Sequence, residues 1–333
     1  MNTFHDQSDA LREAMVAELR GMGGIRSEAV ATAFRAVPRH LFAPDAPVES
    51  VYAANATAWS KYDDAGRMTS TVSAAYIQAV QLEQAQVRPG MRVLEIGSGG
   101  YNAALLAAMV GETGEVTTAD IDPEIVNRAR ACLDVAGYRQ VRTVVADGAT
   151  AVPEHGPYDR IVVTVRSWDI PADWVEQLAP DGQLVVPLQF RGLTRTVALD
   201  RDPRSGMWLS GGDTRLCAFV PMQGAGAHED QIAFLPETVT GGEEGPGRVQ
   251  LRSDAFTRDE LAVMAAGIGD AIKQGGDPVT VWTGVEFDHV DDLDLWLSLH
   301  LPAAVVLTAD REITDTGRPT SITRAGAPAR VSS

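Results

Sequence analysis

The chain has 333 residues, of which 45% are hydrophobic and 22% are charged, a composition typical of soluble globular proteins. At roughly 150 residues per domain, this length predicts about two domains. Because the formal net charge is −17 and no segment forms a basic patch, the sequence argues against nucleic acid as a partner. A basic peptide or a cationic small molecule is a better electrostatic match, although the charge taken alone is better explained by solubility.

Two cysteines, Cys132 and Cys217, are too few for a disulfide framework, and no cysteine and histidine cluster has the spacing of a zinc site. We therefore expect no metal and a reducing, cytoplasmic environment. The N-terminal residues lack the basic and apolar regions of a signal peptide, and no apolar run reaches the ~18 residues of a membrane span. We expect a protein that is neither secreted nor inserted in a membrane.

Residues 1–80 predict an N-terminal helical region with a substrate loop. Apolar residues recur at helical spacing over 10–22, and Ser27 can cap a second helix that ends before Pro38. The stretch 42–70 has no regular pattern, which is typical of a functional or mobile loop.

Residues 81–225 predict a Rossmann-like α/β domain, because helices and strands alternate and each pair implies a right-handed crossover. We expect a mostly parallel sheet with helices on both faces and two antiparallel edge strands near 196–199 and 215–220. The other predicted helices are 74–84, 103–110, 123–136 and 174–178, and the other predicted strands are 92–96, 115–119, 141–146, 160–165 and 183–188.

Residues 226–315 predict a smaller α/β accessory domain, followed by a loose tail at 316–333. A glycine-rich linker or surface loop at 240–247 lies within it, and Thr257 and Glu260 form the capping box of a helix that ends near 275–276. Strands are expected at 248–251 and 279–283, an acidic helix start or docking patch at 287–296, and an apolar run at 303–308.

The stretch 93–104 carries the strongest chemical signal in the chain. Val93 to Ile96 form an apolar run suited to a buried strand, and Gly97, Gly99 and Gly100 follow directly. A strongly helix-forming run begins at Ala103, so the turn ends at a helix N-terminus whose free N–H groups suit a carboxylate or phosphate.

Three acidic residues lie in or after successive predicted strands, where open α/β sheets bind ligands. Glu95 precedes the glycine turn, Asp120 is placed to bind ribose hydroxyls, and Asp147 with Gly148 can hold an adenine amino group. This arrangement fits a nicotinamide nucleotide or S-adenosylmethionine. The glycine spacing is not G-x-G-x-x-G, and Tyr101 obstructs a pyrophosphate, so S-adenosylmethionine is favoured.

With these motifs in order, the chain resembles the protein L-isoaspartyl O-methyltransferases over about 11–224, roughly two thirds of its length. The matching motifs are Val37-Pro38-Arg39-His40-x-Phe42-x-Pro44, Thr71-Val72-Ser73, Pro89-Gly90-x-x-Val93-Leu94-Glu95-Ile96-Gly97, Tyr101-x-Ala103-Ala104, Gly114-x-Val116, Asp147-Gly148, Pro157-Tyr158-Asp159, Gly182-x-Leu184-Val185-x-Pro187 and Phe219-Val220-Pro221.

The resemblance implies a site for each partner of a methyl transfer. It places Thr71 and Ser73 beside the substrate carboxylate and the transferred methyl group. The residues that it places around S-adenosylmethionine are Glu95, Gly97, Ser98, Gly99, Gly100, Asp120, Ile121, Asp147 and Gly148. His40 is expected to make a structural hydrogen bond.

Several departures from the family pattern distinguish this chain. The glycine turn is one residue shorter, the loop 54–68 is enlarged, and 226–333 have no counterpart in the repair enzymes. Arg166, Ser167 and Trp168 replace small residues at the substrate entrance, where Arg166 is a candidate anchor for a carboxylate. A surface arginine without such a role is an equally good interpretation of Arg166.

These departures resemble the branch associated with ribosomally made modified peptides, whose members methylate an aspartate and so form an aspartimide. Our first hypothesis is therefore a methyltransferase for a dedicated, constrained peptide, with the C-terminal domain helping to select it. The alternatives are a repair enzyme for isoaspartyl residues in many proteins and a non-catalytic methyltransferase-like binding protein. The sequence does not fix the oligomeric state.

Overall fold

The computed structural model describes residues 2–97, 99–190, 193–229, 231–234, 241–242, 245–246, 249–252, 256–273 and 306–309. The chain divides into two compact units. The first comprises Met1–Leu188 and Thr194–His228, and the second comprises Gln189–Leu193 and Glu229–Ser333.

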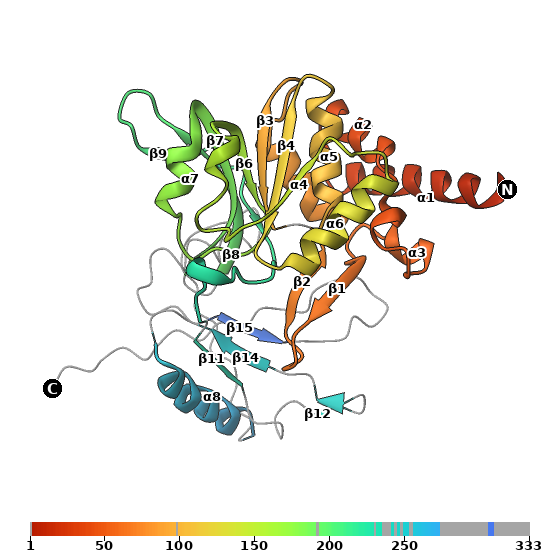
Figure 1. Ribbon diagram of the computed structural model, residues 1–333. Coiled ribbons are helices and arrows are strands. Elements are labelled where there is room, and N and C mark those ends of the chain that lie inside the picture. The colour runs from red at the N-terminus through yellow and green to blue at the C-terminus, as the bar shows by residue number, and fades with distance from the viewer. Residues whose placement is uncertain are drawn as a thin grey trace. The chain divides into compact units, whose positions relative to one another are not determined.

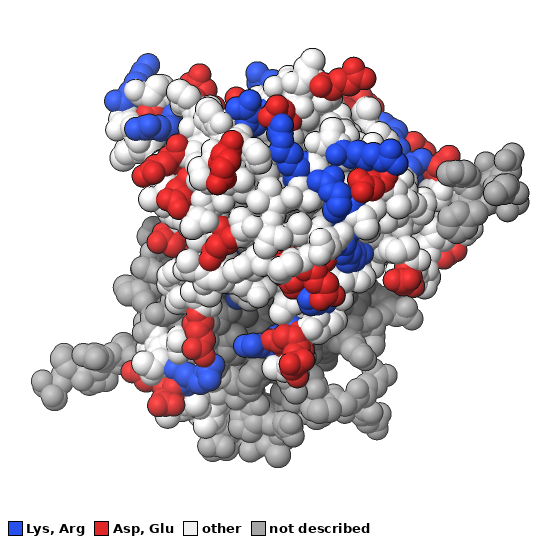
Figure 2. All heavy atoms as spheres, in the orientation of Figure 1, with Lys and Arg blue, Asp and Glu red and all other residues white. Residues whose placement is uncertain are grey.

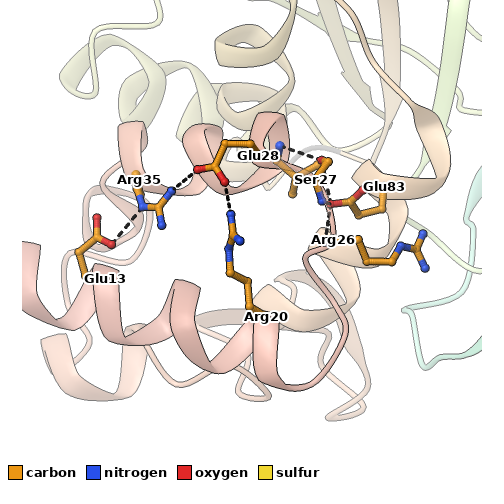
Figure 3. A network of polar contacts seen from close by, with 8 residues as sticks. Glu13, Arg20, Arg26, Ser27, Glu28, Arg35 and Glu83 are labelled. Carbon is orange, nitrogen blue, oxygen red and sulfur yellow. Dashed lines mark hydrogen bonds and ion pairs between the residues drawn. The ribbon is translucent and has the colours of Figure 1, made fainter.

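The first unit opens with two helices, α1 (Asn2–Gly21) and α2 (Glu28–Ala36). Ser27 caps α2 as predicted, because its Oγ accepts from the Val30 N–H. The Glu83 carboxylate in turn accepts from the backbone N–H and the hydroxyl of Ser27, at 2.7 and 2.9 Å. Figure 3 shows this contact beside the ion pairs of Arg20 with Glu28 and of Glu13 with Arg35, which tie the two helices together.

The predicted loop at 42–70 is wrong in its central part, where the chain folds into an antiparallel hairpin of β1 (Trp59–Tyr62) and β2 (Met68–Val72). The Asp63 carboxylate accepts from the N–H groups of Ala65 and Arg67 and closes the turn. Short elements precede the hairpin, namely η1 (Arg39–Phe42) and α3 (Val48–Val51).

The centre of the first unit is an eight-stranded sheet in the order β10-β8-β7-β6-β3-β4-β5, with β9 also paired to β8 (Figure 1). The strands from β7 to β5 in this order are parallel, and β9 and β10 run antiparallel to β8. The strands are β3 (Arg92–Ile96), β4 (Glu115–Asp120), β5 (Arg142–Val145), β6 (Tyr158–Val163), β7 (Leu178–Phe190), β8 (Leu193–Arg201), β9 (Trp208–Ser210) and β10 (Arg215–Leu216).

Helices cover both faces of this sheet, which confirms the predicted fold class (Figure 1). Alternate residues of one strand enter different cores: Val93 packs with the helices near the N-terminus, while Leu94 and Ile96 pack with Trp174 of α7. The remaining elements are α4 (Ala75–Ala85), α5 (Tyr101–Val110), α6 (Pro123–Val135), η2 (Pro153–His155), α7 (Ala172–Gln177) and η3 (Gly224–Gly226).

The second unit contains a three-stranded antiparallel sheet of β11 (Ile232–Phe234), β14 (Val249–Arg252) and β15 (Val306–Ala309). Helix α8 (Arg258–Lys273) begins with the predicted capping box, since Glu260 accepts from the Thr257 N–H at 2.8 Å. A small core of Ala233, Leu251, Leu261 and Ala265 joins helix and sheet.

Several predictions in this part of the chain cannot be compared with the structure. The predicted strand at 279–283, the acidic segment at 287–296 and the tail at 316–333 lie outside the described residues. Two short paired strands, β12 (Gly241–Gly242) and β13 (Gly245–Pro246), fall within the predicted linker. Among the described helices, none combines the length and the apolar character needed to cross a membrane.

Candidate functional site

The glycine turn after β3 is held by close contacts on both sides. Gly97 has a φ of +95°, and a Cβ there would lie 2.7 Å from Thr164 Oγ1. That hydroxyl donates to the Gly97 carbonyl at 2.7 Å. At Gly99 a Cβ would lie 3.2 Å from the Thr71 carbonyl oxygen, so the turn is packed against the end of β2. Ser98 lies outside the described residues.

Gly100 ends the turn and stands at the N-cap of α5, with a φ of +81°. A Cβ at this position would meet the Phe42 ring at 3.2 Å and the Ala129 backbone at 3.3 Å. The N-cap glycine supplies no capping side chain, so among the described residues the first N–H groups of the helix suit an anionic ligand. This arrangement fits the carboxylate of S-adenosylmethionine.

Glu95 is fully buried beneath the turn, where Thr118 Oγ1 donates to its Oε2 at 2.5 Å. Burial raises the pKa of this carboxyl to about 7, against the opposing effects of Thr118 and Asn102. Among the described residues, Glu95 Oε1 and both amide atoms of Asn102 have no partner with hydrogen-bond geometry. Glu95 is thus a polar group below the turn, and its predicted contact with a cofactor stays a prediction.

Asp120 ends β4 and Ile121 follows it, and Asp147 with Gly148 follows β5, so the sheet brings both predicted pairs to the carboxyl ends of its parallel strands. Asp120 Oδ1 accepts from the Asp122 N–H at 2.9 Å. Trp174 Nε1 donates to the Gly148 carbonyl at 2.7 Å and fixes that turn against α7.

Sequence analysis missed the turn η3, which lies directly on this edge. The Ala225 N–H donates to Asp147 Oδ2 at 2.8 Å. Gly224 has a φ of +71°, and a Cβ there would lie 2.3 Å from the same oxygen and 2.6 Å from Ile121 Cδ1. The repeated glycines at 224 and 226 were the available sequence signal, because this close approach needs a residue without a side chain.

The two predicted catalytic hydroxyls have different surroundings. Thr71 Oγ1 donates to the Trp59 carbonyl at 2.6 Å and accepts from Ser60 Oγ at 3.2 Å, so it holds the hairpin together. The Ser73 hydroxyl makes no hydrogen bond to a described residue, while the Ser73 carbonyl accepts from Arg39 Nη2 at 2.7 Å. Ser73 is therefore the better placed of the two to contact a ligand.

Arg39, to which sequence analysis assigned no role, organises the segment that carries Ser73. It is fully buried and also donates to the Val51 carbonyl at 2.8 Å and to Gln78 Oε1 at 2.9 Å. Its guanidinium carbon lies 4.7 Å from the centre of the Tyr101 ring, and burial lowers its pKa. The neighbouring His40 makes the expected structural hydrogen bond, to the Tyr52 hydroxyl at 2.9 Å.

Two further cationic side chains attach the hairpin to α6. The Arg128 guanidinium lies 3.9 Å from the centre of the Trp59 ring. Lys61 Nζ lies 2.7 Å from Asp122 and 2.6 Å from Glu124, at the N-terminus of α6. The hairpin is therefore anchored next to the predicted ribose site.

The predicted substrate segment 166–168 is only partly exposed. The Arg166 N–H donates to the Val220 carbonyl at 2.8 Å. Ser167 is buried and its hydroxyl donates to the Asp169 carbonyl, so its contact with a substrate stays a prediction. Trp168 is 37% exposed and stacks on His228, with ring centroids 3.8 Å apart.

Comparison with known proteins agrees with this geometry. Residues 10–226 match the family described as protein-L-isoaspartate(D-aspartate) O-methyltransferase (PCMT). The chain belongs to this family. Its members are S-adenosylmethionine-dependent carboxyl methyltransferases, which identifies the class of enzyme and its cofactor. Within the described part of the chain, no group of three or more side chains is arranged to hold a metal ion.

Individual relatives cover the same part of the chain. A protein-L-isoaspartate O-methyltransferase of Methanopyrus kandleri is 37% identical over 217 residues, which are 64% of this chain and 91% of that protein. One from Thermococcus sibiricus is 36% identical over 232 residues, 66% of this chain and 97% of that protein.

Two solved structures share the fold. A protein-L-isoaspartate O-methyltransferase has a TM-score of 0.56 and 23% identity, with 90% of this chain and 96% of that chain covered. A PCMT protein from Plasmodium falciparum, in complex with S-adenosyl-L-homocysteine, has a TM-score of 0.54 and 17% identity, with 64% and 98% covered.

The three acceptors on Arg39 predict a large effect of Arg39→Lys, because an ammonium group cannot reproduce the planar fork of donors. Each buried acceptor left unpaired costs about 1–3 kcal/mol, so the free energy of unfolding should fall by about 3 kcal/mol. Urea unfolding measures the change. Arg67→Lys is the matched control, because its 81% exposed side chain should shift stability by less than about 0.5 kcal/mol. Equal effects would contradict the assigned role.

The raised pKa of Glu95 predicts a pH-dependent stability. In the unfolded chain Glu95 loses its proton near its ordinary pKa of 4.5, whereas in the folded protein it keeps the proton up to a pKa of about 7. The folding stability is therefore complete below pH 4.5 and is lost as the pH rises from there through about 7. Glu95→Gln should therefore gain about 2 kcal/mol relative to the native protein between about pH 5 and about pH 8 in urea unfolding.

Glu115→Gln serves as its control. Arg142 and Arg92 lower the pKa of Glu115, so the stability from this carboxylate is already complete at about pH 5. The difference between Glu115→Gln and the native protein should stay constant over that range. If the stability difference between Glu95→Gln and the native protein were also constant over this range, Glu95 would not be a carboxyl that keeps its proton in the folded state.

Proposed function

We propose that the protein transfers a methyl group from S-adenosylmethionine to the free α-carboxylate of isoaspartyl residues in peptides and proteins. The observation that carries the proposal is the packing of Gly99 against the Thr71 carbonyl. It brings the turn suited to the methyl donor against the strand that leads to Ser73. The printed names of the relatives support this acceptor.

The chemistry needs alignment more than proton removal, because a carboxylate with an ordinary pKa near 3.9 is already ionised at neutral pH. The donor supplies an electrophilic methyl on sulfur: an O–CH3 bond forms while the S–CH3 bond breaks, and sulfur keeps the electron pair. In this proposal Ser73 orients the carboxylate, and Arg166 is a candidate for its second anchor.

A second candidate is the methylation of an aspartate side chain in a dedicated, constrained peptide made by the ribosome. The stacked pair of Trp168 and His228, in a segment where the family pattern has small residues, favours a specialised acceptor. The expectation that the residues after 226 have no counterpart in the repair enzymes is wrong, because a solved protein-L-isoaspartate O-methyltransferase covers 90% of this chain, well past the family match. In this candidate these residues are an accessory domain for peptide recognition, but their presence does not by itself separate it from a repair enzyme. The ester would close to an aspartimide when the next backbone nitrogen attacks its carbonyl and methanol leaves.

Two matched peptides separate these candidates: one hexapeptide with an isoaspartyl residue and the same hexapeptide with an ordinary aspartyl residue. We expect methyl transfer to the isoaspartyl form, followed by mass spectrometry as a gain of one methylene, with the aspartyl form much slower. Transfer to neither, although calorimetry shows S-adenosylmethionine binding, would favour the dedicated peptide. Failure to bind S-adenosylmethionine would favour a non-catalytic binding protein.

The role of Ser73 predicts that Ser73→Ala lowers kcat/KM for the isoaspartyl peptide about 10- to 100-fold, since a hydrogen bond to a charged group contributes about 1.5–3 kcal/mol. Affinity for S-adenosylmethionine, measured by calorimetry, should stay unchanged. Ser50→Ala is the control, because the exposed Ser50 hydroxyl donates only to the Pro47 carbonyl. An unchanged kcat/KM in Ser73→Ala would remove this hydroxyl from the site.

A further inference from the structure

A groove of about 800 Å³ lies on the first unit beside β5, which forms one edge of its sheet. One wall is the end of β5 and the residues after it, 144–147. The crossover residues 150–154, 156 and 157 and the α7 residues Asp173, Glu176 and Gln177 complete it. None of the methyl-transfer residues except Asp147 lines this groove.

The groove exists because one crossover lacks an α-helix. The connections from β3 to β4, from β4 to β5 and from β6 to β7 carry α5, α6 and α7. The connection from β5 to β6 contains only the single turn η2 (Pro153–His155). A turn of three residues cannot cover the sheet as a helix does, so a hollow remains beside β5.

The walls of the groove are fixed by hydrogen bonds from α7 and β6. Gln177 Oε1 accepts from the Val152 N–H at 3.0 Å, and its Nε2 donates to the Thr150 carbonyl at 2.9 Å. The Tyr158 hydroxyl donates to the Val152 carbonyl at 2.6 Å. The groove is therefore formed before any ligand arrives.

The strand along the groove has an open edge. Among the described strands, β5 pairs with β4 alone. The Ala146 N–H donates to the Asp120 carbonyl on β4, so by alternation the backbone groups of Val145 point away from β4. The Val145 side chain is 52% exposed. Arg130 closes the start of this edge by donating to the Val141 carbonyl.

The rim of the groove is acidic. Glu154, Asp173 and Glu176 lie along it, and no lysine or arginine belongs to the lining. None of these three carboxylates forms an ion pair with a residue that the structure describes. Figure 2 shows acidic side chains gathered over α7, and the whole chain carries a net charge of −17. The rim therefore attracts cations.

We propose that this groove binds an extended, basic segment of the peptide substrate, which adds a strand to the open edge of β5. Main-chain hydrogen bonds to Val145 select an extended backbone, and the carboxylates of Glu154, Asp173 and Glu176 pair with lysine or arginine side chains. The proposal rests on the proposed function only in that its ligand is part of the methylated peptide.

The test uses the full chain and a fluorescein-labelled octapeptide of alternating lysine and valine, which contains no methyl acceptor. Fluorescence anisotropy should show binding that weakens with added salt. The triple variant Glu154→Gln, Asp173→Asn, Glu176→Gln should bind about tenfold more weakly or worse, and Val145→Lys should also bind more weakly. A labelled octapeptide of alternating glutamate and valine should not bind.

The matched control is Glu18→Gln, Glu112→Gln, Asp259→Asn, which changes the net charge equally at exposed positions outside the groove. This control should retain the affinity. Equal weakening in both triple variants, no binding of the lysine peptide, or a dimer that only the groove variant abolishes would overturn the proposal. Thermal unfolding confirms that each variant is folded.

Methyl transfer provides the separate readout. The groove variant should methylate a short isoaspartyl peptide without basic residues at the native rate. In the native protein a basic segment beside the isoaspartyl residue should lower KM, and in the groove variant it should not. If lysine peptides bind but no peptide is methylated, the proposed function fails and the groove assignment stands. If methyl transfer occurs and the basic flank has no effect, the groove assignment fails alone.

Discussion

A buried guanidinium determines where the segment that carries Ser73 lies. Arg39 donates to the carbonyls of Val51 and Ser73 and to the Gln78 side chain, and its face lies over the Tyr101 ring. Burial of a cation is costly, and here carbonyl dipoles and an aromatic ring offset the lost water. Because Tyr101 begins α5 directly after the glycine turn, this arginine fixes the turn and the segment that carries Ser73 to each other.

The glycines of the turn serve packing as much as ligand binding. Each faces a different neighbour, namely Thr164, the Thr71 carbonyl, and the pair Phe42 and Ala129. The shape of the turn is therefore set by the residue after β6, by β2, by η1 and by α6 before a cofactor arrives. The turn η3 adds a fourth constraint near the end of β5, where the Ala225 N–H donates to one carboxylate oxygen of Asp147.

The sequence predicted the parallel strands well, since buried runs such as 92–96 and 160–165 have few alternatives in an α/β pattern. It also placed Gly97, Asp120 and Asp147 at one edge, because the ends of parallel strands meet there. It missed the hairpin, although Asp63 to Gly66 is a turn signal between residues of strand type. The contacts of Arg39 and Ala225 join residues 12 to 78 positions apart, which no local pattern contains.

The hairpin is attached at its base and free at its tip. Trp59 and Lys61 are joined to α6 through Arg128, Asp122 and Glu124, whereas Tyr62 is 56% exposed and the Arg67 side chain 81% exposed. Changes of length or sequence between 62 and 67 can thus accumulate without disturbing the methyl-donor site.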